Sequence, residues 1–86
     1  MGLTVRYFAS VREAVGIGSE DWPADLPLPG TVAEAREALI ARGSPWSEGL
    51  ARDRVLRAAV NQQMVGPEAQ LQGNDELAFF PPVTGG

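Results

Sequence analysis

Two apolar segments near the ends of the chain alternate in the manner of β-strands. Residues 3–8 and residues 76–80 each place apolar side chains on one parity, which is the two-residue period of a strand with one buried face. The inward residues are Leu3, Val5 and Tyr7 in the first segment and Leu77 and Phe79 in the second. Because both segments are apolar and free of proline, we expect them to pair in the middle of a sheet.

Three weaker segments complete the predicted sheet. Residues 55–60 alternate as one strand, and the chain turns at residues 61–63 into a short return strand at residues 64–65. Residues 20–22 are predicted to form at most a short edge strand, because a proline-rich loop follows them. The residues expected to point inward from the first of these strands are Leu56, Ala58 and Val60.

The period of an α-helix is clearest after Thr31. Thr31 and Glu34 form a capping box, and Gly43 ends the apolar pattern, which predicts a helix of about 11 residues. Its apolar face comprises Val32, Ala35, Leu39 and Ile40. This segment is the main helix of the chain.

Two shorter helices are expected on either side of it. Ser10 and Glu13 also match a capping box, and Gly16 provides a stop, so a helix of about two turns is predicted there. Residues 44–48 predict a single helical turn with Pro45 at its first position. Trp22 and Trp46 are expected to pack under loops, and four arginines are expected to be solvated charges: Arg36, Arg42, Arg52 and Arg54.

This order of elements predicts an α+β fold. One long helix can cover only one face of a sheet, so we expect a mixed sheet of four to five strands with the main helix packed across one face. That arrangement is the β-grasp, or ubiquitin-like, architecture. Residues 1–80 form the predicted domain, and residues 81–86 form a flexible C-terminal tail that we expect to be unordered when free.

Composition removes several kinds of chemistry. The 86 residues include no cysteine and no histidine, which excludes disulfides, thiol nucleophiles, thiolate metal sites and the commonest general base. The net charge of −4, with no basic cluster, is against nucleic-acid binding, and the acidic residues show no metal-ligand spacing. With no signal peptide and no apolar run near the roughly 20 residues of a membrane span, we expect a cytoplasmic protein that does not enter a membrane.

The C-terminal segment, residues 79–86, has a mechanical interpretation. Pro81 and Pro82 stiffen the chain after the last strand and prevent it from folding back. The six residues after Phe80 can extend roughly 20 Å. Gly85 and Gly86 have no side chain, so the terminal carboxylate can enter a channel too narrow for any Cβ atom.

The whole chain resembles the small subunit of molybdopterin synthase, the MoaD family of ubiquitin-like sulfur carriers. The resemblance lies chiefly in the ending Glu-Leu-Ala-Phe-Phe-Pro-Pro-Val-Thr-Gly-Gly, residues 76–86. Residues 8–13 with Gly16, and residues 59–62, agree with it, and the Pro-rich loop at 20–30 agrees least.

The resemblance implies a specific chemistry at the chain end. The carboxylate of Gly86 would be adenylated by an ATP-using activating enzyme and converted to a thiocarboxylate by a sulfur donor. The tail would then enter the large catalytic subunit and deliver sulfur to cyclic pyranopterin monophosphate, in a heterotetramer of two small and two large subunits. This chain would bind no cofactor and would not be an enzyme on its own. The absence of cysteine agrees with a sulfur atom held on the chain end.

A partner-binding surface is predicted beside the tail. By strand parity Phe8 and Phe80 point away from the helix-covered face, and with Met64 they would form an exposed apolar patch. A second small core is the alternative interpretation. Arg12 is expected beside the patch, where it could pair with an acidic residue of a partner. The full set of predicted partner-binding residues is Phe8, Arg12, Met64, Phe80, Pro81, Pro82, Val83 and Thr84.

Three other functions remain open at this point. The chain could be a sulfur carrier of another pathway, for thiamine thiazole or for the tungsten cofactor. It could be a ubiquitin-like protein modifier, although without lysine it could not build chains on itself. It could also be a plain interaction module whose tail has no chemical role.

Overall fold

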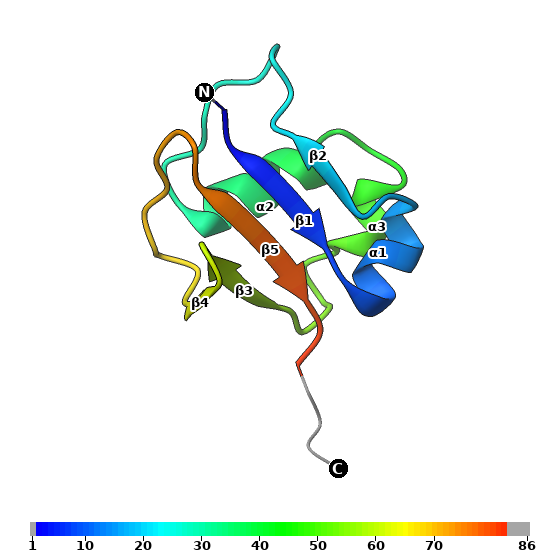
Figure 1. Cartoon of the computed structure of the whole chain (residues 1–86). Helices are drawn as coiled ribbons and strands as arrows, with labels where there is room; N and C mark the ends of the chain where they lie inside the picture. The colour runs from blue at the N-terminus through cyan, green and yellow to red at the C-terminus, as the bar shows by residue number, and fades with distance from the viewer. Residues whose placement is uncertain (1, 83–86) are drawn as a thin grey trace.

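The computed structural model describes residues 2–82, which form a five-stranded sheet with three helices on one side (Figure 1). In chain order the elements are β1 (Thr4–Tyr7), α1 (Ala9–Val15), β2 (Ser19–Asp21), α2 (Val32–Ile40), α3 (Trp46–Gly49), β3 (Arg57–Val60), β4 (Gln63–Val65) and β5 (Glu76–Phe80). Figure 1 looks onto the sheet, with α2 behind the strands and α1 to the side of β1. Within residues 2–82, no helix is long and apolar enough to cross a membrane.

The sheet is mixed, with the first and last strands at its centre. Its order is β2-β1-β5-β3-β4, and β1 and β5 are parallel while every other pair is antiparallel. Val5 lies opposite Leu77, and Phe79 lies between Tyr7 and Ala58. This topology confirms the predicted β-grasp fold and the central pairing, and it places the three-residue strand before the proline-rich loop at an edge.

The core lies between the sheet and the helices. The five side chains predicted to point inward from β1 and β5 are at most 2% exposed: Leu3, Val5, Tyr7, Leu77 and Phe79. They pack in one cluster with Val32, Ala35 and Leu39 of α2. Trp22 and Trp46 also pack on this cluster, as predicted, Trp22 as a buried member and Trp46 partly buried. Strand parity and helix periodicity therefore identified the core correctly.

The main helix begins as predicted but is shorter. Thr31 is the N-cap, and its hydroxyl accepts a hydrogen bond of 3.2 Å from the amide of Glu34. The Glu34 carboxylate accepts from the amide of Gly30 (2.8 Å), one residue before the position that a standard capping box uses. The helix has nine residues rather than about 11, because it ends at Ile40 and Gly43 follows in a turn with a φ of 89°.

The predicted capping box of the first helix is wrong. Phe8 is the N-cap and has no side-chain capping bond, so Ser10 lies inside the helix. The helix starts earlier because the chain reverses at Ala9, with a φ of 53°, directly after β1. The Phe8 carbonyl then accepts from the amides of Val11 and Arg12. Gly16 ends the helix in the left-handed conformation, as predicted.

Three of the four arginines expected to be solvated have structural roles instead. Arg36 donates to the carbonyls of Leu50, Ala51 and Arg54 (2.8, 2.5 and 2.9 Å), and so holds the segment before β3 against α2. Arg54 itself donates to the carbonyl of Gly49 (2.9 Å). β3 starts at Arg57 and not at residue 55, the predicted start. The residues just before it are held in turns by the hydrogen bonds of Arg36 and Arg54, so the strand begins later.

The third of these arginines, Arg42, belongs to a cluster around Glu20 of β2. The Glu20 carboxylate accepts from the Tyr7 hydroxyl (2.7 Å), from Nε1 of Trp46 (2.8 Å) and from Arg42 (3.1 Å). The guanidinium carbon of Arg42 lies 3.6 Å from the centroid of the Trp46 ring. Burial works to raise the pKa of Glu20, but these three hydrogen bonds outweigh it and leave the pKa below its usual value. Burial, reinforced by Glu20, raises the pKa of Tyr7. The cluster ties the edge strand to α3.

Candidate functional site

The face of the sheet turned away from the helices, which we call the open face, has a floor of small residues. Ala59 and Ala78 lie opposite each other on β3 and β5, with opposite parity to the core residues Val60 and Leu77. Each is at most 9% exposed although neither belongs to the core cluster. The larger side chains around them therefore shield them.

Three large apolar side chains surround this floor. Met64 lies opposite Ala59 on β4 and is 62% exposed, while Phe80 ends β5 and is partly exposed. Phe8 continues β1 in an extended conformation, is 40% exposed, and its amide donates to the Phe79 carbonyl (3.2 Å). We call the set Phe8, Ala59, Met64, Ala78 and Phe80 the apolar patch.

The structure thus brings Phe8, Met64 and Phe80 to one face, as the strand parity indicated. They form no second core within residues 2–82, since none of the three belongs to the core cluster and two of them are among the exposed large apolar side chains.

Sequence reasoning missed Arg6 as part of this surface. Its guanidinium carbon lies 5.3 Å from the centroid of the Phe8 ring, and its Nη1 atom lies 3.3 Å from a carboxylate oxygen of Glu76. The available signal was parity, because Arg6 and Phe8 are two residues apart on one strand and so share a face. Ala59 and Ala78 were also missed, since small residues give no sign of exposure in a sequence.

Arg12 lies beside the patch rather than over it. It is exposed on α1, and its guanidinium group lies against Gly18, where an added Cβ atom would come within 3.3 Å of Nε. Gly18 accepts from the amide of Tyr7 (2.9 Å), so Arg12 stands at the sheet edge near the end of β1.

The tail starts at the patch. β5 ends at Phe80, and Pro81 and Pro82, both partly exposed, lead the chain away from the sheet (Figure 1). The predicted site residues Val83, Thr84, Gly85 and Gly86 lie outside the described residues.

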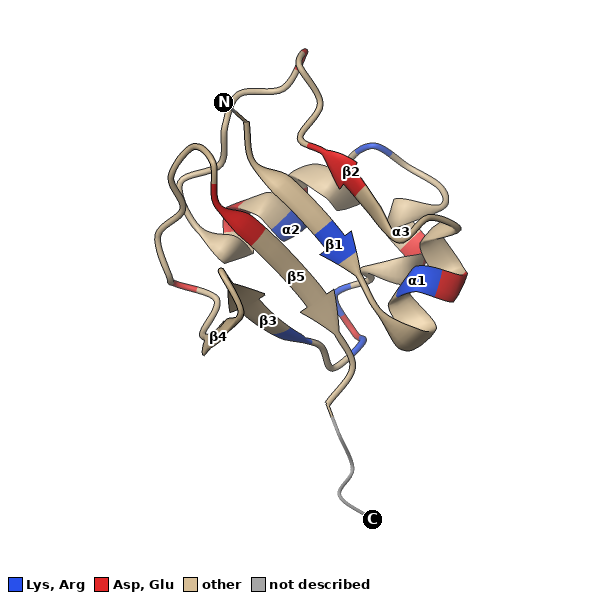
Figure 2. Cartoon of the chain, in the orientation of Figure 1, with Lys and Arg blue, Asp and Glu red and all other residues tan. Residues whose placement is uncertain are grey.

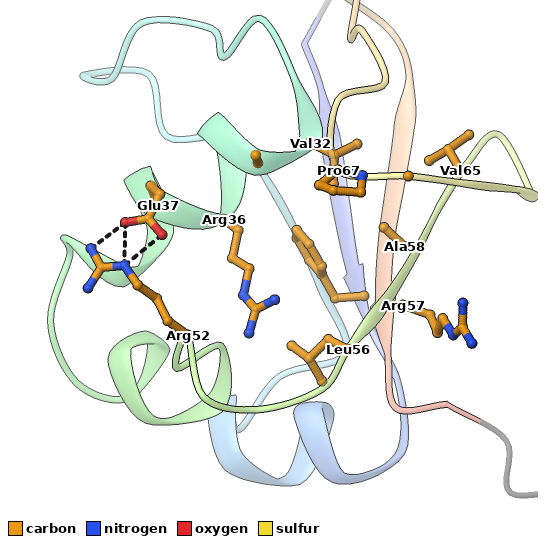
Figure 3. Close-up of a pocket in the computed structure, with 12 residues that line it drawn as sticks. Val32, Arg36, Glu37, Arg52, Leu56, Arg57, Ala58, Val65 and Pro67 are labelled. Atoms are coloured by element: carbon orange, nitrogen blue, oxygen red, sulfur yellow. Dashed lines mark hydrogen bonds and ion pairs between the residues drawn. The ribbon is translucent and has the colours of Figure 1, made fainter.

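A groove of about 390 Å³ lies on the other side of the sheet (Figure 3). Its apolar lining includes Val32, Leu56 and Phe79. Three of its four charged side chains are already engaged, because Arg36 binds three carbonyls and Arg52 pairs with Glu37 at 2.8 and 2.9 Å from Nε, whereas the fourth, Arg57, points away from them (Figure 3). The bonds from Arg52 hold the pKa of Glu37 below its usual value. Arg36, Glu37 and Arg52 are therefore bound mainly to groups of the protein itself.

The candidate site consists of an apolar surface for docking and the start of the C-terminal tail. The sequence has no cysteine or histidine, and residues 2–82 contain no group of carboxylates that could hold a metal ion. An apolar patch this close to the start of the tail can bind a partner and direct the chain end into it.

Comparison with known proteins gives a consistent picture. The model of the ThiS family matches residues 5–86. Over 84 residues the chain is 44% identical to the molybdopterin synthase sulfur carrier subunit of Escherichia coli (strain K12), covering 98% of this chain and 99% of that protein. It is 37% identical, with the same coverage, to the protein of that name from Haemophilus influenzae.

The fold is also found in a solved complex. The structure is similar to a chain in the protein–protein complex of subunits 1 and 2 of the molybdopterin-converting factor from Helicobacter pylori, with a TM-score of 0.64 and 23% identity over the full length of both chains. At that identity the likeness concerns the fold.

Proposed function

Since the chain belongs to the ThiS family, we propose that it is the sulfur-carrier subunit of a molybdopterin synthase and that it bears its sulfur on Gly86. The observation that supports this most directly is the 44% identity, over nearly the whole chain, to a protein of that name. The ending Phe-Phe-Pro-Pro-Val-Thr-Gly-Gly gives the chain an end suited to the task.

The proposed chemistry takes place at the C-terminal carboxylate. An activating enzyme transfers AMP from ATP to the Gly86 carboxylate and releases pyrophosphate, which converts a poor electrophile into a good one. Sulfide supplied by a sulfur donor then attacks the acyl carbon, displaces AMP and leaves a thiocarboxylate. The thiocarboxylate delivers its sulfur to cyclic pyranopterin monophosphate, and water restores the carboxylate. No side-chain thiol competes for the sulfur, because the chain has no cysteine.

The described residues supply the docking part of this function. Phe80 belongs both to the apolar patch and to the strand from which the tail departs. The four residues after Pro82 span at most about 13 Å, so a partner that takes up Gly86 must come close to the patch. Covering the patch provides the affinity that a short tail lacks.

The proposed partners follow from the same scheme. They are the large catalytic subunit, in a heterotetramer of two small and two large subunits, the activating enzyme, and a sulfur donor. The Helicobacter pylori complex of subunits 1 and 2 is consistent with the first of these. The chain itself binds no cofactor, catalyses no step alone, and works in the cytoplasm.

The test is the intact mass of the protein after incubation with ATP, the activating enzyme and a sulfur donor. Replacement of one oxygen by sulfur adds about 16 Da, and the sulfur-loaded protein should convert the pterin precursor when the large subunit is added. The same mixture without ATP should leave the mass unchanged. A protein that gains no sulfur from its own activating enzyme contradicts the proposal.

Deleting Gly86 gives a second, independent test. The variant should lose sulfur loading completely, while its urea unfolding midpoint stays at the wild-type value, because Gly86 lies beyond the domain that contains the core. A clear fall in stability would contradict the division into domain and tail.

A further inference from the structure

The open face is polarised along its strands. At the start of β5, Thr4 lies between Asp21 and Glu76, so two carboxylates belong to that end of the face. Towards the end of β5, where the tail begins, the register places Arg6 opposite Ala78 and Arg57 opposite Phe80. Figure 2 shows the same order, with the acidic start of β5 and the arginines of β1 and β3 nearer its end. The basic end is unexpected in a chain of net charge −4.

Arg57 is the least committed of these charges. Its side chain is exposed, and among residues 2–82 no carboxylate lies within 4 Å of its guanidinium group. It points away from Arg36 and from the Arg52–Glu37 pair in the groove (Figure 3). Four arginines outside the open face bind carbonyls or carboxylates of the protein: Arg36, Arg42, Arg52 and Arg54. The side chain of Arg12 on α1 makes no hydrogen bond or ion pair within residues 2–82, but it does not lie on the strands of the open face.

Arg6 is only partly used by the chain itself. Its guanidinium group makes one hydrogen bond to Glu76 and stacks near Phe8, and its side chain remains 44% exposed. A guanidinium group has five N–H donors, and within residues 2–82 the side chain of Arg6 uses one of them. Arg6 and Arg57 thus both adjoin the apolar patch, Arg6 on β1 beside Ala78 and Arg57 on β3 beside Phe80.

A partner that covers the patch must also meet these two charges. Covering Phe8, Met64 and Phe80 removes water from the guanidinium groups next to them, and a cation that loses water without gaining an acceptor costs free energy. Carboxylates on the partner would replace that water with charge-assisted hydrogen bonds.

We propose that Arg6 and Arg57 are specificity-determining residues that select a partner surface with an apolar centre and a carboxylate facing each of the two arginines. The partner is the large catalytic subunit, so this inference rests on the proposed function. A second copy of the chain fits less well. On the strands of the open face, each copy offers one free carboxylate, Asp21, for two arginines, because Glu76 already binds Arg6.

The test measures the binding of the full-length chain to the large subunit of its own synthase, at about 50 and 300 mM salt. Arg57→Glu should raise Kd about tenfold or more at low salt, mainly through slower association, and less at high salt. Arg57→Gln should have a smaller effect, and Arg6→Gln should weaken binding in the same direction. The matched control is Arg52→Gln, since Arg52 is also exposed but belongs to the helix side, and it should bind like the wild type. Replacing the facing carboxylate of the large subunit by arginine should restore the binding of Arg57→Glu.

Two results overturn the inference. One is an Arg57→Glu variant that binds like the wild type at both salt concentrations. The other is a dimer of the isolated chain by light scattering that Arg57→Glu dissociates, which would make a second copy the occupant. Urea midpoints of all variants exclude unfolding as the cause. If the wild type takes up and transfers sulfur while the arginine variants bind normally, only this inference fails. If the wild type gains no sulfur, the proposed function fails, and this inference with it.

Discussion

Replacing Met64 by alanine separates the binding role of the apolar patch from its role in folding. Met64 is on the edge strand β4 and is 62% exposed, so most of its apolar surface is still in contact with water in the free protein. The variant should therefore bind the large subunit more weakly while the free domain stays nearly as stable as the wild type.

The magnitude follows from the exposed fraction. Burying a methionine side chain completely is worth about 1.5–3 kcal/mol. Covering the exposed 62% of Met64 is then worth about 1–2 kcal/mol, which corresponds to about a 5- to 30-fold rise in Kd for Met64→Ala. The part of the Met64 side chain that is already buried in the free protein is smaller than the exposed part. Met64→Ala should therefore lower the unfolding free energy of the free domain by at most about 1 kcal/mol.

The assay is titration calorimetry with the large subunit, together with urea unfolding of the free chain. Leu28→Ala provides the matched control. Leu28 is 57% exposed, close to Met64, but it lies in the loop between β2 and α2. In Figure 1 this loop is at the end of the molecule opposite the tail. Leu28→Ala should leave Kd unchanged.

Two outcomes would refute this reasoning. If Met64→Ala binds as tightly as the wild type, the partner does not cover the β4 side of the patch. If Leu28→Ala weakens binding equally, the loss reflects general apolar exposure and the open face has no special role.

Three further predictions concern the stability of the domain and are checked by urea unfolding. Glu20→Gln should cost about 1–2 kcal/mol at pH 7. Because the folded-state pKa of Glu20 is lowered, its contribution is present above the ordinary glutamate pKa of about 4.3 and is lost as pH falls through the lower folded value. The gap from the wild type should hence narrow below about pH 4, and a gap that stays constant to pH 3 would contradict the assignment. Gly49→Ala should cost about 1–3 kcal/mol, because its Cβ atom would lie 2.7 Å from Cγ2 of Val15. Gly73→Ala, which meets no atom within 4 Å, is its control, and equal losses would count against the packing argument. Thr31→Ala should cost about 1 kcal/mol through loss of the N-cap bond while Thr31→Ser retains it, so equal stability of the two variants would argue against capping.

The candidate site was only partly accessible from the sequence. Parity placed Phe8 and Phe80 on the face opposite the core, and the turn at Asn61 and Gln62, one residue shorter than predicted, brings Met64 to the same face. Arg57 alternates with the inward residues Leu56 and Ala58, so the sequence indicates only that it points outward, and nothing in its own segment indicates that Phe80 lies beside it. That neighbour comes from a strand more than twenty residues further along the chain.

The sequence by itself determined the inward side chains, the start of the main helix, and the mixed sheet with its two central strands. Each of these follows from local periodicity or from a short run of residues, which the rest of the chain does not alter. Only the tertiary structure decided the roles of the arginines and of Glu20. Glu20 binds Tyr7, Arg42 and Trp46, at separations of 13 to 26 residues. A charged side chain can be solvated, paired or bound to carbonyls in the same local pattern, and the choice depends on which distant segments the fold brings within hydrogen-bonding distance.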